Sequence, residues 1–67
     1  VMGEITNKDK AECAEREVKQ RRYVYPRRVA DGKMTQALAD RQIALMEAIA
    51  ADYRAKADEE DAKGRLF

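Results

Sequence analysis

The sequence has no histidine, no tryptophan, one cysteine and one proline among its 67 residues. The absence of histidine removes the residue that most often serves as a general base or as a metal ligand. A single cysteine excludes an internal disulfide framework and a cysteine-based zinc site. We therefore expect a chain that is not an enzyme and holds neither a cofactor nor a metal.

Long apolar runs and an excess of charge of one sign are missing as well. Lysine and arginine number 14 and aspartate and glutamate 13, which leaves a formal net charge of +1. This balance does not point to nucleic acid or to an anionic membrane surface. No run approaches the roughly 18 apolar residues of a membrane span. With no signal-peptide pattern and one unpaired cysteine, we expect a reducing cytoplasm as its location.

Helical patterning is what the sequence does contain. From about residue 8 to residue 30 it predicts one helix, with Thr6 or Asn7 as the N-cap. Its apolar positions recur at intervals close to three and four, and alanines dominate the first half of this stripe. Pro26 removes a backbone donor, so the helix either kinks there or breaks, and we favour one kinked helix. Gly32 is expected as the left-handed residue that ends it.

A second helix is predicted over about residues 36–62, with Thr35 as its N-cap. Its apolar residues cover about half of the helix circumference. Two helices joined by a short turn make an antiparallel helical hairpin, so the fold class is all-α. We expect residues 1–67 to form this single unit, with frayed tails at 1–6 and 64–67.

The apolar arc of the second helix is wider than one partner helix can cover. A hairpin alone would also struggle against an ordering cost of about 1.5 kcal/mol per residue. Both points favour a homodimer that forms a four-helix bundle. The residues expected in its core or dimer stripe are Val18, Leu38, Leu45, Met46, Ile49 and Tyr53.

A basic segment spans residues 16–30, where six basic residues stand against one acidic residue. Arginines interleaved with tyrosines can bind a protein partner, or grip phosphates and stack on bases. The candidate partner-binding residues are Arg21, Arg22, Tyr23, Arg27 and Arg28. A third interpretation is internal: residues 40–61 are acidic, and an antiparallel pairing puts Arg16 and Lys19 opposite the region of Glu47.

Cys13 has two interpretations. As a redox or cross-linking thiol it would need a stabilised thiolate, but Glu12 and Glu15 flank it and disfavour one. We therefore expect a small residue packed in the seam between the helices.

Residues 21–53 carry a specific pattern: an arginine pair, Val-Tyr-Pro-Arg, a glycine-containing turn, Met-Thr, Ala-Asp and Met-Glu-Ala-Ile. This pattern resembles a family of short helical proteins carried by temperate phages and prophages of Gram-negative bacteria. The matching residues are Arg21, Arg22, Val24, Tyr25, Pro26, Arg27, Val29, Gly32, Met34, Thr35, Ala39, Asp40, Met46, Glu47, Ala48 and Ile49.

The resemblance implies an accessory phage product acting in the host cytoplasm. Together with the composition, it favours a protein-binding module that modulates or inhibits a host or phage protein and also binds itself. One alternative is a small nucleic-acid-binding or transcription-modulating protein that uses the same arginines. Another is a structural factor in phage assembly.

Overall fold

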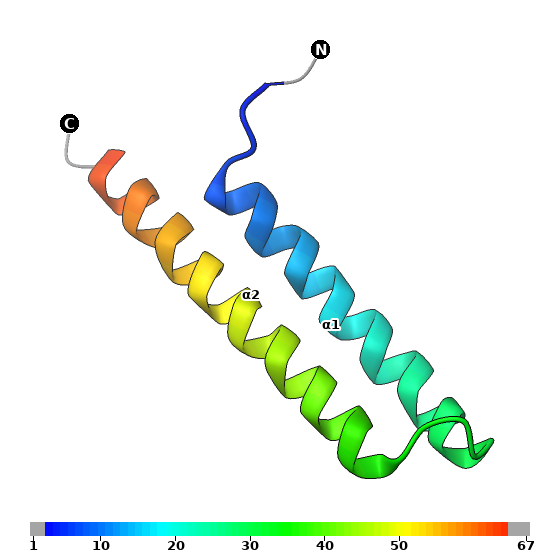
Figure 1. Ribbon diagram of the computed structural model, residues 1–67. Helices are drawn as coiled ribbons and strands as arrows, with labels where there is room; N and C mark the ends of the chain where they lie inside the picture. The colour runs from blue at the N-terminus through cyan, green and yellow to red at the C-terminus, as the bar shows by residue number, and fades with distance from the viewer. Residues whose placement is uncertain (1–2, 65–67) are drawn as a thin grey trace.

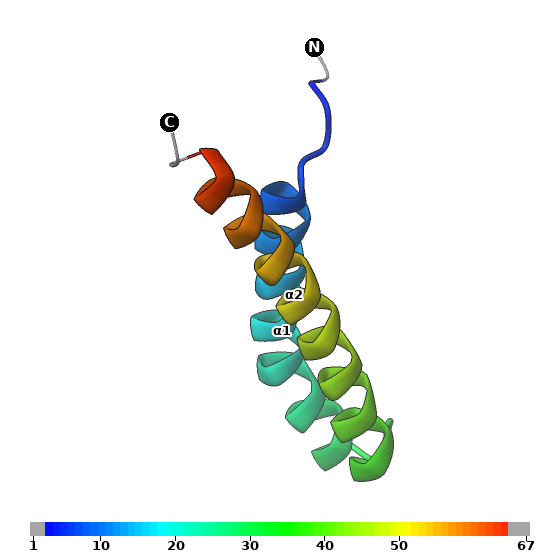
Figure 2. The same ribbon diagram turned by 90° about the vertical axis from the view of Figure 1, so that its left-hand side faces the viewer.

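The computed structural model describes residues 3–64, which form two α-helices joined by a short turn. Helix α1 spans Asn7–Ala30 and helix α2 spans Gln36–Gly64. The helices pack side by side in opposite directions, so the start of α1 and the end of α2 lie at one end of the molecule (Figures 1 and 2). The predicted all-α helical hairpin is confirmed.

Helix α1 begins with a reciprocal cap. The Thr6 hydroxyl accepts a hydrogen bond from the backbone N–H of Asp9 at 3.0 Å, and the Asp9 carboxylate accepts one from the N–H of Thr6 at 3.1 Å. This capping box satisfies two backbone donors that have no partner inside the helix. Of the two predicted caps, the structure uses Thr6. Of the predicted N-terminal tail, residues 3–6 precede the helix, with Thr6 held in the cap, and residues 1–2 lie outside the described part.

Pro26 lies inside α1, which continues through it to Ala30. Of the two predicted alternatives, a break into two helices is therefore wrong. Proline has no N–H to donate to the carbonyl of Arg22, four residues earlier. Because Pro26 is exposed, that carbonyl can be hydrated, and this allows the helix to continue.

The turn follows from local hydrogen bonds. Gly32 adopts a φ of 74° and donates its N–H to the carbonyl of Val29, while the N–H of Lys33 reaches the carbonyl of Arg28. These two bonds form a Schellman motif, in which glycine avoids the steric cost of the left-handed conformation. Thr35 then caps α2 by accepting the N–H of Leu38 at 3.1 Å. The predicted roles of Gly32 and Thr35 are confirmed.

Helix α2 is longer than predicted at its C-terminal end. It includes Gly64, which the sequence places in a tail. Residues 65–67, the rest of that predicted tail, lie outside the described part. The extension continues a run without glycine or proline up to Lys63, where the positive charge complements the helix dipole.

Small residues fill the contact between the helices. The buried residues of the described part are Ala11, Ala14, Val18, Ala39, Ala50 and Ala57. Alanines let two helices approach closely, but each removes little apolar area from water. The hairpin is a thin layer measuring 54 × 26 × 13 Å, and 13 Å is little more than the diameter of one helix.

Candidate interaction surfaces

The arginines of the basic segment divide into two groups. Arg21 is half-buried and bridges the helices: its Nε donates to Glu17 Oε1 at 2.9 Å and its Nη1 donates to the backbone carbonyl of Gln42 at 2.9 Å. Arg22 donates from Nη2 to Glu47 Oε2 at 2.6 Å. Both side chains therefore hold α1 against α2. For these two arginines, the charge is used within the chain, as the third interpretation of the basic segment expects.

Tyr23 and Arg27 form a pair on the surface of α1. The Arg27 guanidinium lies 4.5 Å from the centroid of the Tyr23 ring, and its Nη2 donates to the tyrosine hydroxyl at 2.7 Å. The residues are four positions apart and therefore share one face of the helix. Tyr23 is 64% exposed, so the pair is fixed in position while its ring remains accessible.

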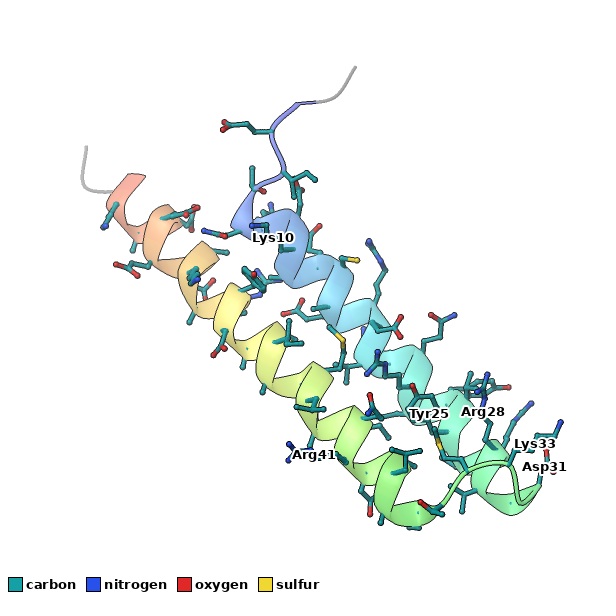
Figure 3. All side chains as sticks on the ribbon, viewed as in Figure 1. Lys10, Tyr25, Arg28, Asp31, Lys33 and Arg41 are labelled. Atoms are coloured by element: carbon teal, nitrogen blue, oxygen red, sulfur yellow. The ribbon has the colours of Figure 1, made fainter. Side chains whose placement is uncertain are left out.

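Arg28 lies beside Tyr25 on another side of α1, near the turn (Figure 3). Both residues line a shallow groove of about 280 Å³, together with Gln20 and Val24. Arg21 lies 5.9 Å from the centroid of the Tyr25 ring, which links this groove to the contact between the helices. The structure thus separates Arg28 from the Tyr23–Arg27 pair by about a third of the helix circumference.

The two broad faces of the hairpin differ in character. On one face, ion pairs cross between the helices: Arg22 with Glu47, and Arg54 with Glu15. On the other face, Cys13 of α1 and Met46, Ile49 and Tyr53 of α2 line an apolar groove of about 530 Å³. We call these the charged face and the apolar face.

The six residues expected in the core or dimer stripe are distributed unevenly. Val18 is buried between the helices, and Met46 packs against the cluster that it forms with Ala14 and Ala50. Tyr53 is half-buried. The remaining three stay open to solvent, with exposed fractions of 47% for Leu38, 40% for Leu45 and 43% for Ile49. Of these, Ile49 lines the groove of the apolar face.

Two residues of the apolar face were missed by the sequence interpretation. Cys13 is exposed and lines the groove, so its expected place in the seam between the helices is wrong. The seam is taken by Ala11, Ala14 and Val18, and position 13 falls to the side of that stripe. Ile5 precedes α1 and also lines the groove. A hydrophobic residue just before the N-cap is a signal that sequence reasoning can use.

Within residues 3–64, no cluster of three or more acidic, histidine or cysteine side chains is arranged to hold a metal ion. In the same part of the chain, neither helix has an apolar stretch of the length a bilayer requires. No protein-family model matches the chain, and neither a curated protein nor a solved structure matches it. The surfaces above therefore carry the functional argument.

The ion pair of the charged face that joins Glu15 to Arg54 is bidentate. Arg54 donates from Nε to Oε2 at 2.9 Å and from Nη2 to Oε1 at 2.8 Å. These hydrogen bonds stabilise the carboxylate and lower the pKa of Glu15 below its ordinary value of 4.5, outweighing the opposing effect of burial. The same bonds raise the pKa of Arg54.

The lowered pKa of Glu15 predicts a pH dependence of stability. The contribution of this pair is complete above the unfolded-state pKa near 4.5 and is lost as the pH falls through the lower folded-state pKa. Glu15→Gln is therefore expected to flatten the decline of the urea midpoint between about pH 5 and pH 3. Glu4→Gln, which removes a carboxylate ahead of α1, serves as the control. An equal decline in wild type and Glu15→Gln would contradict the assignment.

Proposed function

We propose that this chain is a small protein-binding module that binds and modulates another protein of the phage or its host, with the Tyr23–Arg27 pair as its anchor. The observation that carries the proposal is a tyrosine that is 64% exposed and yet has its ring held in place by a guanidinium at 4.5 Å. A cytoplasmic location and the phage context implied by the resemblance belong to the same proposal.

Pre-organisation is the physical reason for choosing this pair. Tyrosine and arginine are the side chains most often found at the energetic centre of protein interfaces. Ordering a side chain on binding costs about 0.5–1.5 kcal/mol. The hydrogen bond from Arg27 to the Tyr23 hydroxyl at 2.7 Å reduces that cost before a partner arrives. The positive charge beside the ring favours an acidic partner surface.

The division of the arginines supports a protein partner over nucleic acid. Affinity for nucleic acid grows with the number of phosphates neutralised. Of the four candidate arginines, Arg21 and Arg22 are engaged with Glu17 and Glu47, and the other two, Arg27 and Arg28, lie on different sides of α1. Such a surface suits one compact contact better than a tract of phosphates.

The proposal predicts that the partner is lost when the Tyr23 ring is removed. We would use tagged full-length protein to capture partners from bacterial lysate, with and without nuclease, and identify them by mass spectrometry. Tyr23→Ala should reduce recovery of the specific partner by about 30-fold, the effect of an interface anchor worth 2 kcal/mol. Tyr23→Phe, which keeps the ring but loses the hydrogen bond, should fall between this variant and wild type.

Arg41→Ala provides the matched control. Arg41 is an exposed arginine on α2, and Figure 3 shows it on the side of that helix away from α1. Its replacement removes the same kind of charge without touching the Tyr23–Arg27 pair and should leave recovery unchanged. Equal recovery with Tyr23→Ala would refute the anchor. Enrichment that disappears after nuclease treatment would favour the nucleic-acid alternative.

A further inference from the structure

Over residues 3–64, the hairpin is a single layer of two helices without the second layer that folded domains use to cover a hydrophobic face. Its radius of gyration is 15.5 Å, against about 11 Å for a compact chain of this length. Its accessible surface of 5476 Å² is about 1,200 Å² more than the roughly 4,300 Å² expected for a compact 7.7 kDa monomer. The excess surface shows that a large area is available for burial.

That available surface is apolar on only one side. Positions 38, 45, 49 and 53 of α2 follow one another at intervals of seven and four, so their side chains share one face of the helix. Ile49 and Tyr53 line the groove of about 530 Å³ whose α1 wall includes Cys13, and Leu38 and Leu45 continue the same helix face toward the turn. The opposite face carries the ion pairs of Glu15 and Arg22 and needs no cover. A partner layer therefore fits the apolar face.

We propose that the apolar face docks against the same face of a second copy of this chain, forming a four-helix bundle of two hairpins. The area supports this occupant, because a stable interface buries about 800 Å² on each partner and the broad side of the hairpin, 54 × 26 Å, is large enough to supply it. In a two-fold contact the same patch is used on both copies. The charges on the rim of one copy must therefore be compatible with the same charges on the other copy.

The rim of the groove meets that requirement. It carries Asp9, Lys10 and Glu17, so both signs are present along one edge. Lys10 lies above the Tyr53 ring, with its Nζ 5.2 Å from the ring centroid, and Figure 3 shows it at the α1 edge. A rim of mixed sign can pair with its own copy, whereas a rim of one sign would repel it. The formal net charge of +1 adds little repulsion between copies.

The first test is the mass of the full chain in solution. We expect light scattering at micromolar concentration to give twice the protomer mass of 7.7 kDa. Ile49→Glu should raise the dissociation constant by about 100-fold or more, because a two-fold interface receives the buried charge twice. Ala48→Glu places the same charge on an exposed neighbour outside the apolar face and should leave the dimer intact.

Cys13 supplies a second test that needs no variant. It lines the groove, so a second copy would shield its thiol from a soluble thiol reagent. The rate of modification per protomer should fall at least tenfold as the protein concentration rises above the dissociation constant. In denaturant, the rate should not depend on concentration. This measurement decides the matter even if Ile49→Glu fails to fold.

Three results would overturn the proposal. One is a folded monomer at about 100 μM with a concentration-independent rate of Cys13 modification. The second is a dimer that Ile49→Glu does not weaken, because another surface would then form the contact. The third is a monomer that binds an apolar dye, which would assign the face to a different protein. The test is independent of the Tyr23–Arg27 anchor, since neither of those residues lines the groove.

Discussion

Val18→Asp is expected to remove most of the helical structure at room temperature. Val18 is 7% exposed and is the one buried residue of the described part that is not alanine. An uncompensated charge buried between two helices costs roughly 3–5 kcal/mol. The free energy of unfolding of a 67-residue chain is only about 3–10 kcal/mol in total. The far-UV circular dichroism signal and the urea midpoint measure the loss.

Two further substitutions separate charge from size. Val18→Ala removes two methyl groups and should cost about 1–2 kcal/mol, so the fold should survive with a lower midpoint. Ala48→Asp introduces the same carboxylate at an exposed position of α2 and should change stability by less than about 1 kcal/mol. If Val18→Asp kept its helicity and its midpoint, the contact between α1 and α2 at this position would be disproved.

The helices and their ends could be predicted because their causes are local. Thr6, Gly32 and Thr35 act through hydrogen bonds or a backbone angle within a few residues of themselves. Such local contacts can be predicted from the identity and spacing of neighbouring residues. The end of α2 was less predictable, since Gly64 carries only a weak preference against helix.

The charge pairing between the helices was predicted in kind but displaced in position. Lys19 was expected opposite Glu47, and both line one groove, but the ion pair of Glu47 is with Arg22, three residues later. The reason is the direction of side chains, which lean toward the N-terminus of their own helix. In antiparallel helices the two partners lean in opposite directions. The ends of two paired side chains therefore meet when each residue lies a few positions later in the sequence than the residues whose Cα atoms are level with each other.

The choice of which apolar residues face inward could not be read from the sequence. The apolar arc of α2 covers about half of the helix, and a helical wheel does not show which part of that arc meets α1. The structure buries Ala39, Ala50 and Ala57 between the helices and leaves Leu45 and Ile49 exposed to solvent. The alanines of α1 permit a close approach only to other small residues. The surface of α1 therefore determines which residues of the α2 arc face inward.

Pro26→Ala is expected to stabilise the protein. A proline in a helix interior is about 3 kcal/mol less favourable than alanine, because it leaves the carbonyl of Arg22 without its donor and clashes with it. Proline also restricts the unfolded chain. Its loss makes the unfolded state more favourable by about 0.4–1 kcal/mol, which offsets part of the gain. The net gain of about 2 kcal/mol should raise the melting temperature by roughly 10 °C at a fixed protein concentration.

The continuity of α1 through residue 26 is what this prediction tests. If α1 were broken at Pro26, the proline would sit at a helix start, where it is tolerated, and alanine would bring no gain. Gln20→Ala is the control, because position 20 is an exposed site of the same helix where no backbone hydrogen bond changes. Its expected effect is below about 0.5 kcal/mol. A melting temperature of Pro26→Ala no higher than that of this control would show that the helix does not continue through Pro26 in solution.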